Sequence, residues 1–105
     1  MALNVFISQP MAGLTTQQIT QRRDHIAELV KNRYGDDVTI IDSILTKQPM
    51  NKNPSVHCLG TSLQLMADAD LAVFDIGYEF ARGCRIEHQV AIDYNIDVVY
   101  VSDLI

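Results

Sequence analysis

Cysteine is scarce in this sequence and tryptophan is absent. The two cysteines, Cys58 and Cys84, lie 26 positions apart and form no Cys-x-x-Cys motif. Such sparse use argues against a disulfide-stapled secreted domain and favours a reducing compartment. The sequence also lacks an apolar run of the roughly 18–20 residues that a membrane-spanning helix needs, and its first residues lack the basic segment and cleavage site of a signal peptide. We therefore expect a cytoplasmic protein with no membrane partner.

Positive charge is also in short supply. Eight Lys and Arg stand against 13 Asp and Glu, which gives a net charge of −5. A surface that coats nucleic acid needs clustered cations, so we expect no nucleic-acid partner, although one or two local arginines can still hold a small anion. The glycine-rich dinucleotide motif, the P-loop lysine and the nucleophile elbow of α/β-hydrolases are absent as well.

The sequence contains residue types that can bind a metal, but their spacing is not that of a usual metal site. Cys84 and His88 lie four residues apart, and His57 and Cys58 form a second pair. Zinc sites are usually built from close ligand pairs on both sides, and a cysteine is commonly just a small buried hydrophobe. We therefore expect no metal and no cofactor.

Hydrophobic residues are plentiful, at 48% of the 105 positions, which predicts one globular domain over residues 1–105. Short apolar runs, typical of strands buried on both faces, alternate with segments of helical period. The predicted strands are 3–7, 38–41, 71–74 and 98–101; the predicted helices run from a Thr15–Gln18 capping box to Tyr34, over a short segment at 59–66, and over 83–94.

This alternation predicts an α/β class with right-handed crossovers. We expect a compact Rossmann-like, three-layer domain with a parallel sheet of four to five strands in the order 2-1-3-4. In such a sheet, ligands bind in the crevice beyond the carboxyl ends of the two strands between which the chain reverses direction. That crevice should be lined by residues 8–13 and 75–83. The longest irregular stretch, 42–57, is expected to be a functional or mobile loop.

Glu87 is the first candidate for chemistry in this crevice. It falls in the first turn or two of the helix predicted over 83–94, where the helix dipole favours anions, so we expect its carboxylate to be ionised. An ionised, fixed carboxylate is what a nucleophile at a sugar anomeric carbon needs. The alternative is that Glu87 only complements the helix dipole.

Two arginines flank Gly83 at the start of the same helix. Arg82 and Arg85 can clamp a phosphate, because a guanidinium fork matches its oxygens. The alternative is that they form structural ion pairs with the nearby carboxylates of Asp75, Glu79 or Glu87.

Three segments, in this order and spacing, resemble the nucleoside 2-deoxyribosyltransferase superfamily, which includes the deoxynucleoside 5′-monophosphate N-glycosidases. They are residues 5–13 at the first turn, residues 69–74 at the third strand and residues 83–87 at the helix start. The resemblance spans nearly the whole chain, and the nearest subgroup consists of short proteins, often encoded by phages or prophages.

The resemblance implies a mechanism as well as a fold. Glu87 matches the glutamate that attacks C1′ of a nucleoside or nucleotide, and the glycosyl-enzyme is then resolved by a second base or by water. The superfamily often completes its sites with a neighbouring subunit, which implies a homo-oligomer. The residues expected to contact the nucleoside or nucleotide are Phe6, Ser8, Gln9, Pro10, Met11, Gly13, Ser62, Arg82, Gly83 and Arg85.

This chain departs from the superfamily at three positions. Ser62 stands where catalytic members carry an aspartate that assists the leaving base, and a hydroxyl cannot replace a carboxylate in proton transfer at neutral pH; Asp75 is the candidate substitute. Gln9 replaces a glycine, and Ala81 replaces a phosphate-binding serine.

Two hypotheses therefore stay open. One is an N-glycosidase or deoxyribosyltransferase with Glu87 as nucleophile. The other is a non-catalytic binder that holds a nucleotide or nucleotide-derived signal as a sensor or sink. A third, an interaction module with an empty crevice, does not explain the charged loops at the switch point.

Overall fold

A four-stranded parallel sheet forms the centre of the molecule. The computed structural model describes residues 2–44 and 50–105. The strands β1 (Leu3–Ser8), β2 (Val38–Ile40), β3 (Leu71–Phe74) and β4 (Asp97–Tyr100) are arranged in the order β2-β1-β3-β4. All three neighbouring pairs are parallel. The predicted α/β class and strand order are therefore confirmed, with the two most apolar strands at the centre.

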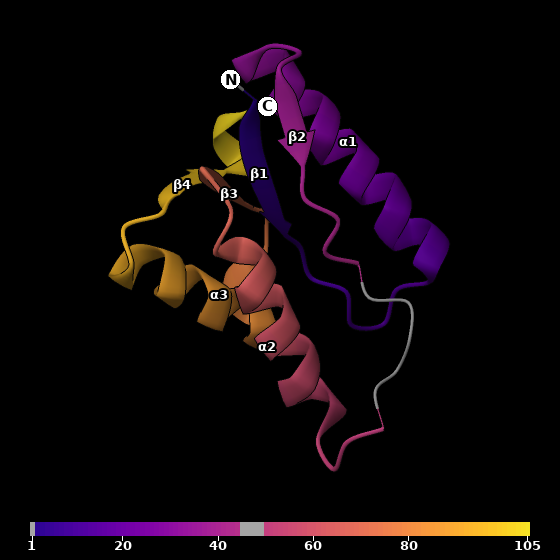
Figure 1. The fold of residues 1–105 in the computed structure, drawn as a ribbon. Helices are drawn as coiled ribbons and strands as arrows, with labels where there is room; N and C mark the ends of the chain where they lie inside the picture. The colour runs from indigo at the N-terminus through magenta and orange to yellow at the C-terminus, as the bar shows by residue number, and fades with distance from the viewer. Residues whose placement is uncertain (1, 45–49) are drawn as a thin grey trace.

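Three helices connect the strands (Figure 1). They are α1 (Thr16–Tyr34), α2 (Pro54–Met66) and α3 (Arg82–Asp93). The capping box predicted at the start of α1 is present, because the Thr15 side chain accepts from the Gln18 backbone and the Gln18 side chain accepts from the Thr15 backbone. Gly35 ends the helix at φ +92°, a backbone conformation that side chains with a Cβ disfavour.

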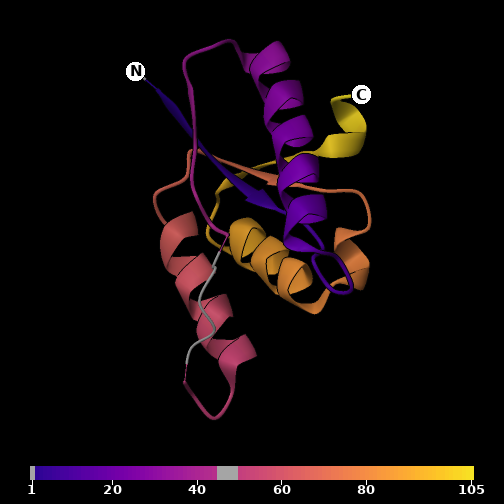
Figure 2. The ribbon, with the colours of Figure 1, turned by 90° about the vertical axis from the view of Figure 1, so that its right-hand side faces the viewer.

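The helices cover both faces of the sheet, as the two ribbon views show (Figures 1 and 2). Helix α1 buries Ile26 and Val30 against one face, and α2 and α3 pack on the other face around Met66 and Ala91. Because successive strand residues point to opposite faces, β1 contributes Val5 and Ile7 to the first cluster but Phe6 to the second. This alternation decides which helix each residue at the strand ends will face.

The start of α2 is the predicted boundary that differs most from the structure. Helix α2 begins at Pro54, with the Asn53 side chain accepting from the Val56 backbone, so the last residues of the stretch expected to be irregular over 42–57 are helical. Proline at the first helical position after an asparagine cap is a helix-start signal, and it outweighs the turn-forming tendency of the same residues. Residues 45–49 lie outside the described part of that stretch.

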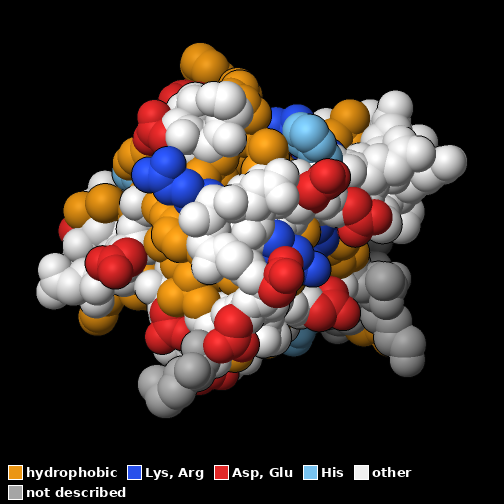
Figure 3. Space-filling model, turned by 90° about the horizontal axis from the view of Figure 1, so that it is seen from above, with side chains coloured by type: hydrophobic (Ala, Val, Ile, Leu, Met, Phe, Trp, Pro, Cys, Tyr) orange, Lys and Arg blue, Asp and Glu red, His pale blue; other side chains and the backbone are white. Residues whose placement is uncertain are grey.

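The loop expected after β3 contains a short 3-10 helix, η1 (Tyr78–Phe80), before α3 begins at Arg82. A second 3-10 helix, η2 (Val101–Asp103), begins at Val101, which was expected to be the last residue of β4. No helix within the described ranges is long and apolar enough to cross a membrane. Acidic and basic side chains are interspersed on the face seen in Figure 3.

Candidate functional site

The carboxyl ends of β1 and β3 meet where the sheet order predicts a crevice. Ser8 pairs with Phe74 in the strand register, and the Asp75 backbone donates to the Ser8 carbonyl at 2.9 Å. The side chains of Ser8 and Asp75 emerge on opposite faces of the sheet. Ser8 meets α3, whereas Asp75 meets α1. The switch point therefore carries one polar centre on each face.

The centre on the α3 side is the carboxylate of Glu87. The Ser8 hydroxyl donates to Glu87 Oε1 at 2.6 Å, a length typical of a hydroxyl bonded to an ionised carboxylate. The Ser62 hydroxyl of α2 acts on the same carboxyl group and lowers its pKa. Both Ser8 and Glu87 are buried, at 2% and 8% exposure. Three elements, β1, α2 and α3, thus converge on one carboxyl group.

The electrostatic environment of Glu87 differs from the sequence-based expectation. Burial raises the pKa of Glu87 above its ordinary value, and the hydroxyls of Ser8 and Ser62 only partly oppose that shift. This shift in pKa is opposite to the effect that the sequence analysis expected from the helix N-terminus. Glu87 lies in the second turn of α3, beyond the free N–H groups of the first turn, and loss of hydration outweighs the remaining effect of the dipole.

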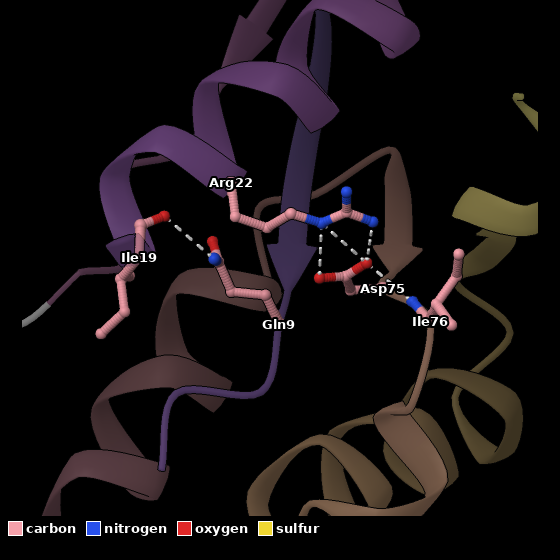
Figure 4. A network of polar contacts seen from close by, with 5 residues as sticks. All are labelled: Gln9, Ile19, Arg22, Asp75 and Ile76. Atoms are coloured by element: carbon pink, nitrogen blue, oxygen red, sulfur yellow. Dashed lines mark hydrogen bonds and ion pairs between the residues drawn. The ribbon is translucent and has the colours of Figure 1, made fainter. Parts of the chain in front are cut away.

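The centre on the α1 side is an ion pair between Arg22 and Asp75 (Figure 4). Arg22 Nη2 lies 2.7 Å from Asp75 Oδ1, and Arg22 Nε lies 3.1 Å from Asp75 Oδ2. The Ile76 backbone donates to the same carboxylate at 2.7 Å. Asp75 is 6% exposed, so this two-pronged contact engages a buried carboxylate on both oxygens. Such a partner orients the Asp75 carboxylate toward α1, on the face of the sheet opposite to Glu87.

The Gln9 side chain also forms its hydrogen bonds with α1. Its side-chain amide donates to the Ile19 carbonyl at 3.1 Å and accepts from Arg23 at 3.5 Å. Arg23 in turn donates to the Ile41 carbonyl and to the Ser43 hydroxyl. The Gln9 side chain, 3% exposed, fixes the β1–α1 loop to α1 rather than facing the Glu87 side.

The other residues near the end of β1 that were expected to contact the ligand lie partly in the core and partly on the surface. Phe6, 1% exposed, lies in the hydrophobic cluster under α2 and α3. Pro10 is half-buried, and Met11 and Gly13 are exposed in a turn closed by the Leu14 backbone donating to the Met11 carbonyl at 3.1 Å. Gly13 adopts φ +79°, which favours glycine. The exposed turn, rather than Phe6, is available to a ligand.

The two arginines near Gly83 are free of carboxylates within the part of the chain that the structure describes. Arg82 and Arg85 are both exposed, and neither forms an ion pair or hydrogen bond with a described acid. Asp75, which the sequence analysis considered as an ion-pair partner of these two arginines, pairs with Arg22 instead. The sequence analysis did not single out Arg22. Gly83 carries no Cβ, and a Cβ there would meet nothing within 4 Å. Two cations with no acidic partner among the described residues therefore lie at the start of α3.

The neighbouring face of α3 carries an aromatic cluster. His88 Nε2 lies 2.8 Å from Tyr100 Oη, and the ring of Tyr78 stacks on that of Tyr100 with 5.6 Å between centroids. A hollow of about 130 Å³ opens beside Tyr78 and Tyr100 at the ends of β3 and β4. His88 is thus engaged with Tyr100, and the described residues include no group of three metal-ligating side chains.

Comparisons with known proteins returned no relative of this chain: no family model, no curated protein and no solved structure matches it. The functional argument therefore depends on the residues of the site and on their geometry.

Proposed function

We propose that the protein cleaves or transfers the N-glycosidic bond of a nucleoside or nucleoside 5′-monophosphate, with Glu87 as the nucleophile. The observation that carries this proposal is the buried Glu87 carboxylate, held by the Ser8 hydroxyl at 2.6 Å beside the carboxyl end of β1. A buried, hydrogen-bonded carboxylate at the switch point of a parallel sheet is a functional-site candidate on physical grounds. The superfamily resemblance supplies the reaction class.

The chemistry requires an ionised carboxylate. One oxygen of Glu87 bonds to C1′ of the sugar while the C1′–N bond breaks, and its electron pair leaves with the base, which takes a proton from solvent. Water or a second base then attacks C1′ and releases the carboxylate. Because burial raises the pKa of Glu87, the nucleophilic form becomes populated only as the pH rises through that raised value. We expect the rate of base release to increase with pH over this range.

The arginines at the start of α3 support a phosphate-bearing substrate. Arg82 and Arg85 have no described carboxylate partner, and a guanidinium that is not neutralised within the protein can bind phosphate oxygens. Phosphate recognition is therefore part of the proposal, and a comparison of nucleosides with their 5′-monophosphates tests it separately from cleavage.

The proposal is tested by measuring free base after incubation with a panel of nucleosides and 5′-monophosphates. Glu87→Gln should lower base release by more than about a thousandfold. The matched control is Glu79→Gln, which changes an exposed glutamate of η1 and should release base at the wild-type rate. Base release by Glu87→Gln at the wild-type rate would remove Glu87 from the mechanism.

The arginines have their own variants in the same assay. Arg82→Met and Arg85→Met should each weaken use of the monophosphates by roughly 10-fold or more, since a hydrogen bond to a charged group contributes about 1.5–3 kcal/mol, and should leave nucleosides unaffected. The homo-oligomer that the resemblance implies stays a prediction, which sedimentation of the purified chain tests.

A second candidate function is a nucleotide binder without turnover. It is favoured by one observation. Asp75 is paired with Arg22, and position 62 carries a serine rather than an acid, so the described site contains no second free carboxylate beside Glu87. A binder should raise its melting temperature with ligand concentration as RT ln(1 + [L]/Kd) predicts. Recovery of intact nucleotide after denaturation would support this candidate, and recovery of free base would exclude it.

A further inference from the structure

The two oxygens of the Glu87 carboxylate differ in their surroundings. The Ser8 hydroxyl donates to Oε1 at 2.6 Å, and both side chains are buried. Over the part of the chain that the structure describes, no further hydrogen bond is found at this carboxylate, and no buried side-chain oxygen is without a partner. Because Glu87 keeps 8% of its surface exposed, Oε2 is the oxygen that reaches solvent. Oε2 is therefore the oxygen that can attack C1′ of a substrate.

The ionised form of Glu87 is stabilised by hydroxyl groups rather than by cations. Burial raises the pKa of Glu87, two hydroxyls, that of Ser8 first, lower it, and no charged group in the described ranges shifts it. Asp75, at the neighbouring end of β3, is paired with Arg22 at 2.7 Å on the opposite face of the sheet. Cys84, one turn before Glu87 on α3, is a thiol whose pKa burial raises, so it is neutral as well. Negative charge on Oε1 therefore depends on the hydrogen bond from Ser8.

We propose that Ser8 is a positioning residue for Glu87: its hydroxyl fixes Oε1, leaves Oε2 as the attacking oxygen, and stabilises the carboxylate as it departs from C1′ in the second step. This role rests on the proposed function, in which Glu87 is the nucleophile. It assigns a different part of the reaction to each oxygen of Glu87, and it makes release of the sugar the step that depends on Ser8.

The charge on Oε1 changes in opposite directions in the two steps. In the first step, an electron pair of Oε2 forms the bond to C1′, the C1′–N bond breaks, and its pair leaves with the base, which takes a proton from solvent. Oε1 becomes the carbonyl oxygen of the ester, so the hydrogen bond from Ser8 weakens. In the second step, water attacks C1′ and gives a proton to solvent, and the electron pair of the Oε2–C1′ bond returns to the carboxylate. Negative charge then reappears on Oε1, where the Ser8 hydroxyl meets it with its own proton still in place.

Removal of the Ser8 hydroxyl should therefore affect the two steps unequally. Without this donor the carboxylate is a stronger base, which favours its bond to C1′ and opposes its release from the ester. A hydrogen bond to a charged group is strong enough to change a rate by about 10-fold or more. In Ser8→Ala we expect the second step to slow by about that factor relative to the first, so the glycosyl-enzyme accumulates. A carboxylate that was merely displaced would instead slow the first step, because attack requires correct geometry.

The test compares the wild type with Ser8→Ala and with a matched control, Ser43→Ala. Ser43 is also a buried serine, but its hydroxyl accepts from Arg23 on the α1 side. Each protein is saturated with the nucleoside or 5′-monophosphate from which the wild type releases base fastest, at a pH above its own Glu87 titration midpoint. Intact-protein mass spectrometry of acid-quenched samples then gives the ratio of glycosylated to free protein in the steady state. This ratio should rise by about 10-fold or more in Ser8→Ala and should stay at the wild-type value in Ser43→Ala.

Titration of Glu87 tests the contact with Ser8 without a substrate. The side-chain carboxyl is followed by carbon-13 NMR in protein labelled at glutamate, and Glu87→Gln identifies its resonance. Ser8→Ala should move the midpoint upward by about one pH unit, because the variant lacks the donor that stabilises the ionised form. Ser43→Ala should leave the midpoint where it is.

An unchanged midpoint in Ser8→Ala, or a ratio of glycosylated to free protein that does not rise, would overturn the inference. An equal response of Ser43→Ala would overturn it as well, since loss of any buried hydroxyl would then have the same effect. A wild type that releases no base would refute the proposed activity, and with it the role of Ser8 in the second step. The expected shift in midpoint would in that case still show that Ser8 controls the proton affinity of Glu87.

Discussion

Replacing Glu87 by glutamine should make the protein more stable at neutral and alkaline pH. Glu87 is 8% exposed, and burial raises its pKa above the ordinary value of 4.5. In the unfolded chain the same carboxyl titrates at the ordinary value. Between the two values the folded state holds the proton more often than the unfolded state does. Linkage then requires the free energy of unfolding to fall as the pH rises through this window.

The size of the effect follows from the shift in pKa. Each unit by which burial raises the pKa of Glu87 lowers the free energy of unfolding by about 1.4 kcal/mol above the window. For a domain of this length, about 1 kcal/mol corresponds to about 4 °C in melting temperature, so each unit is worth about 5 °C. The amide of glutamine still accepts from Ser8 through its oxygen, and its NH2 group can donate to Ser62, so no new unsatisfied group is created.

The assay is a thermal melt of the wild type and Glu87→Gln, followed by circular dichroism across the pH range. The wild type should lose stability relative to the variant as the pH rises from about 4.5, and the two should converge at acid pH, where Glu87 is protonated in both states. Asp75→Asn is the matched control, and it should change the free energy of unfolding in the opposite direction. It leaves Arg22 without its carboxylate and should lower stability by about 1–2 kcal/mol at neutral pH, because Arg22 is partly solvated.

Two results would refute this reasoning. A variant Glu87→Gln that melts at or below the wild-type temperature at pH 8 would show that the ionised carboxylate is not destabilising. A stabilisation that stays constant from acid to alkaline pH would show that its origin is packing rather than ionisation. Either result would also weaken the expected rise of base release with pH, which depends on the same raised pKa.

Two further predictions concern the scaffold. Ile26→Ala should lower the free energy of unfolding by about 2–5 kcal/mol, because Ile26 is fully buried between α1 and the sheet; urea denaturation with an unchanged m-value would confirm a loss of stability without a change of fold. Gly60→Ala should raise stability by up to about 1 kcal/mol, because a Cβ there meets nothing within 4 Å in the middle of α2, and a lower melting temperature would show that the position is occupied by another part of the protein.

The predicted fold was correct because its signals are local. The apolar runs of β1 and β3 each occupy a few consecutive residues, and the capping box at Thr15 and Gln18 spans one helical turn. Right-handed crossovers then leave few ways to order four parallel strands. Where local signals competed, as at Asn53 and Pro54, the composition of the longer stretch gave the wrong boundary for α2.

The candidate site was predictable only in part. Glu87 and Ser8 were both singled out, but their direct contact joins positions 79 apart in the chain. The pairing of Arg22 with Asp75 spans 53 positions, and nothing near Arg22 in the sequence distinguishes it from the other basic residues of α1. Gln9 was assigned to the ligand because of its place in a motif, whereas the alternation along the strand end turns it toward α1.

The sequence by itself determined the alternation of strands and helices, the order of the sheet and the edge at which polar residues gather, since each depends on patterns within a few turns or a single strand. Only the tertiary structure decided the protonation behaviour of Glu87 and the partners of Asp75 and Ser8. The affinity of a carboxyl group for its proton depends on how much water its neighbours exclude and on which donors they bring. For Glu87 those neighbours come from β1 and α2, which are remote in the chain.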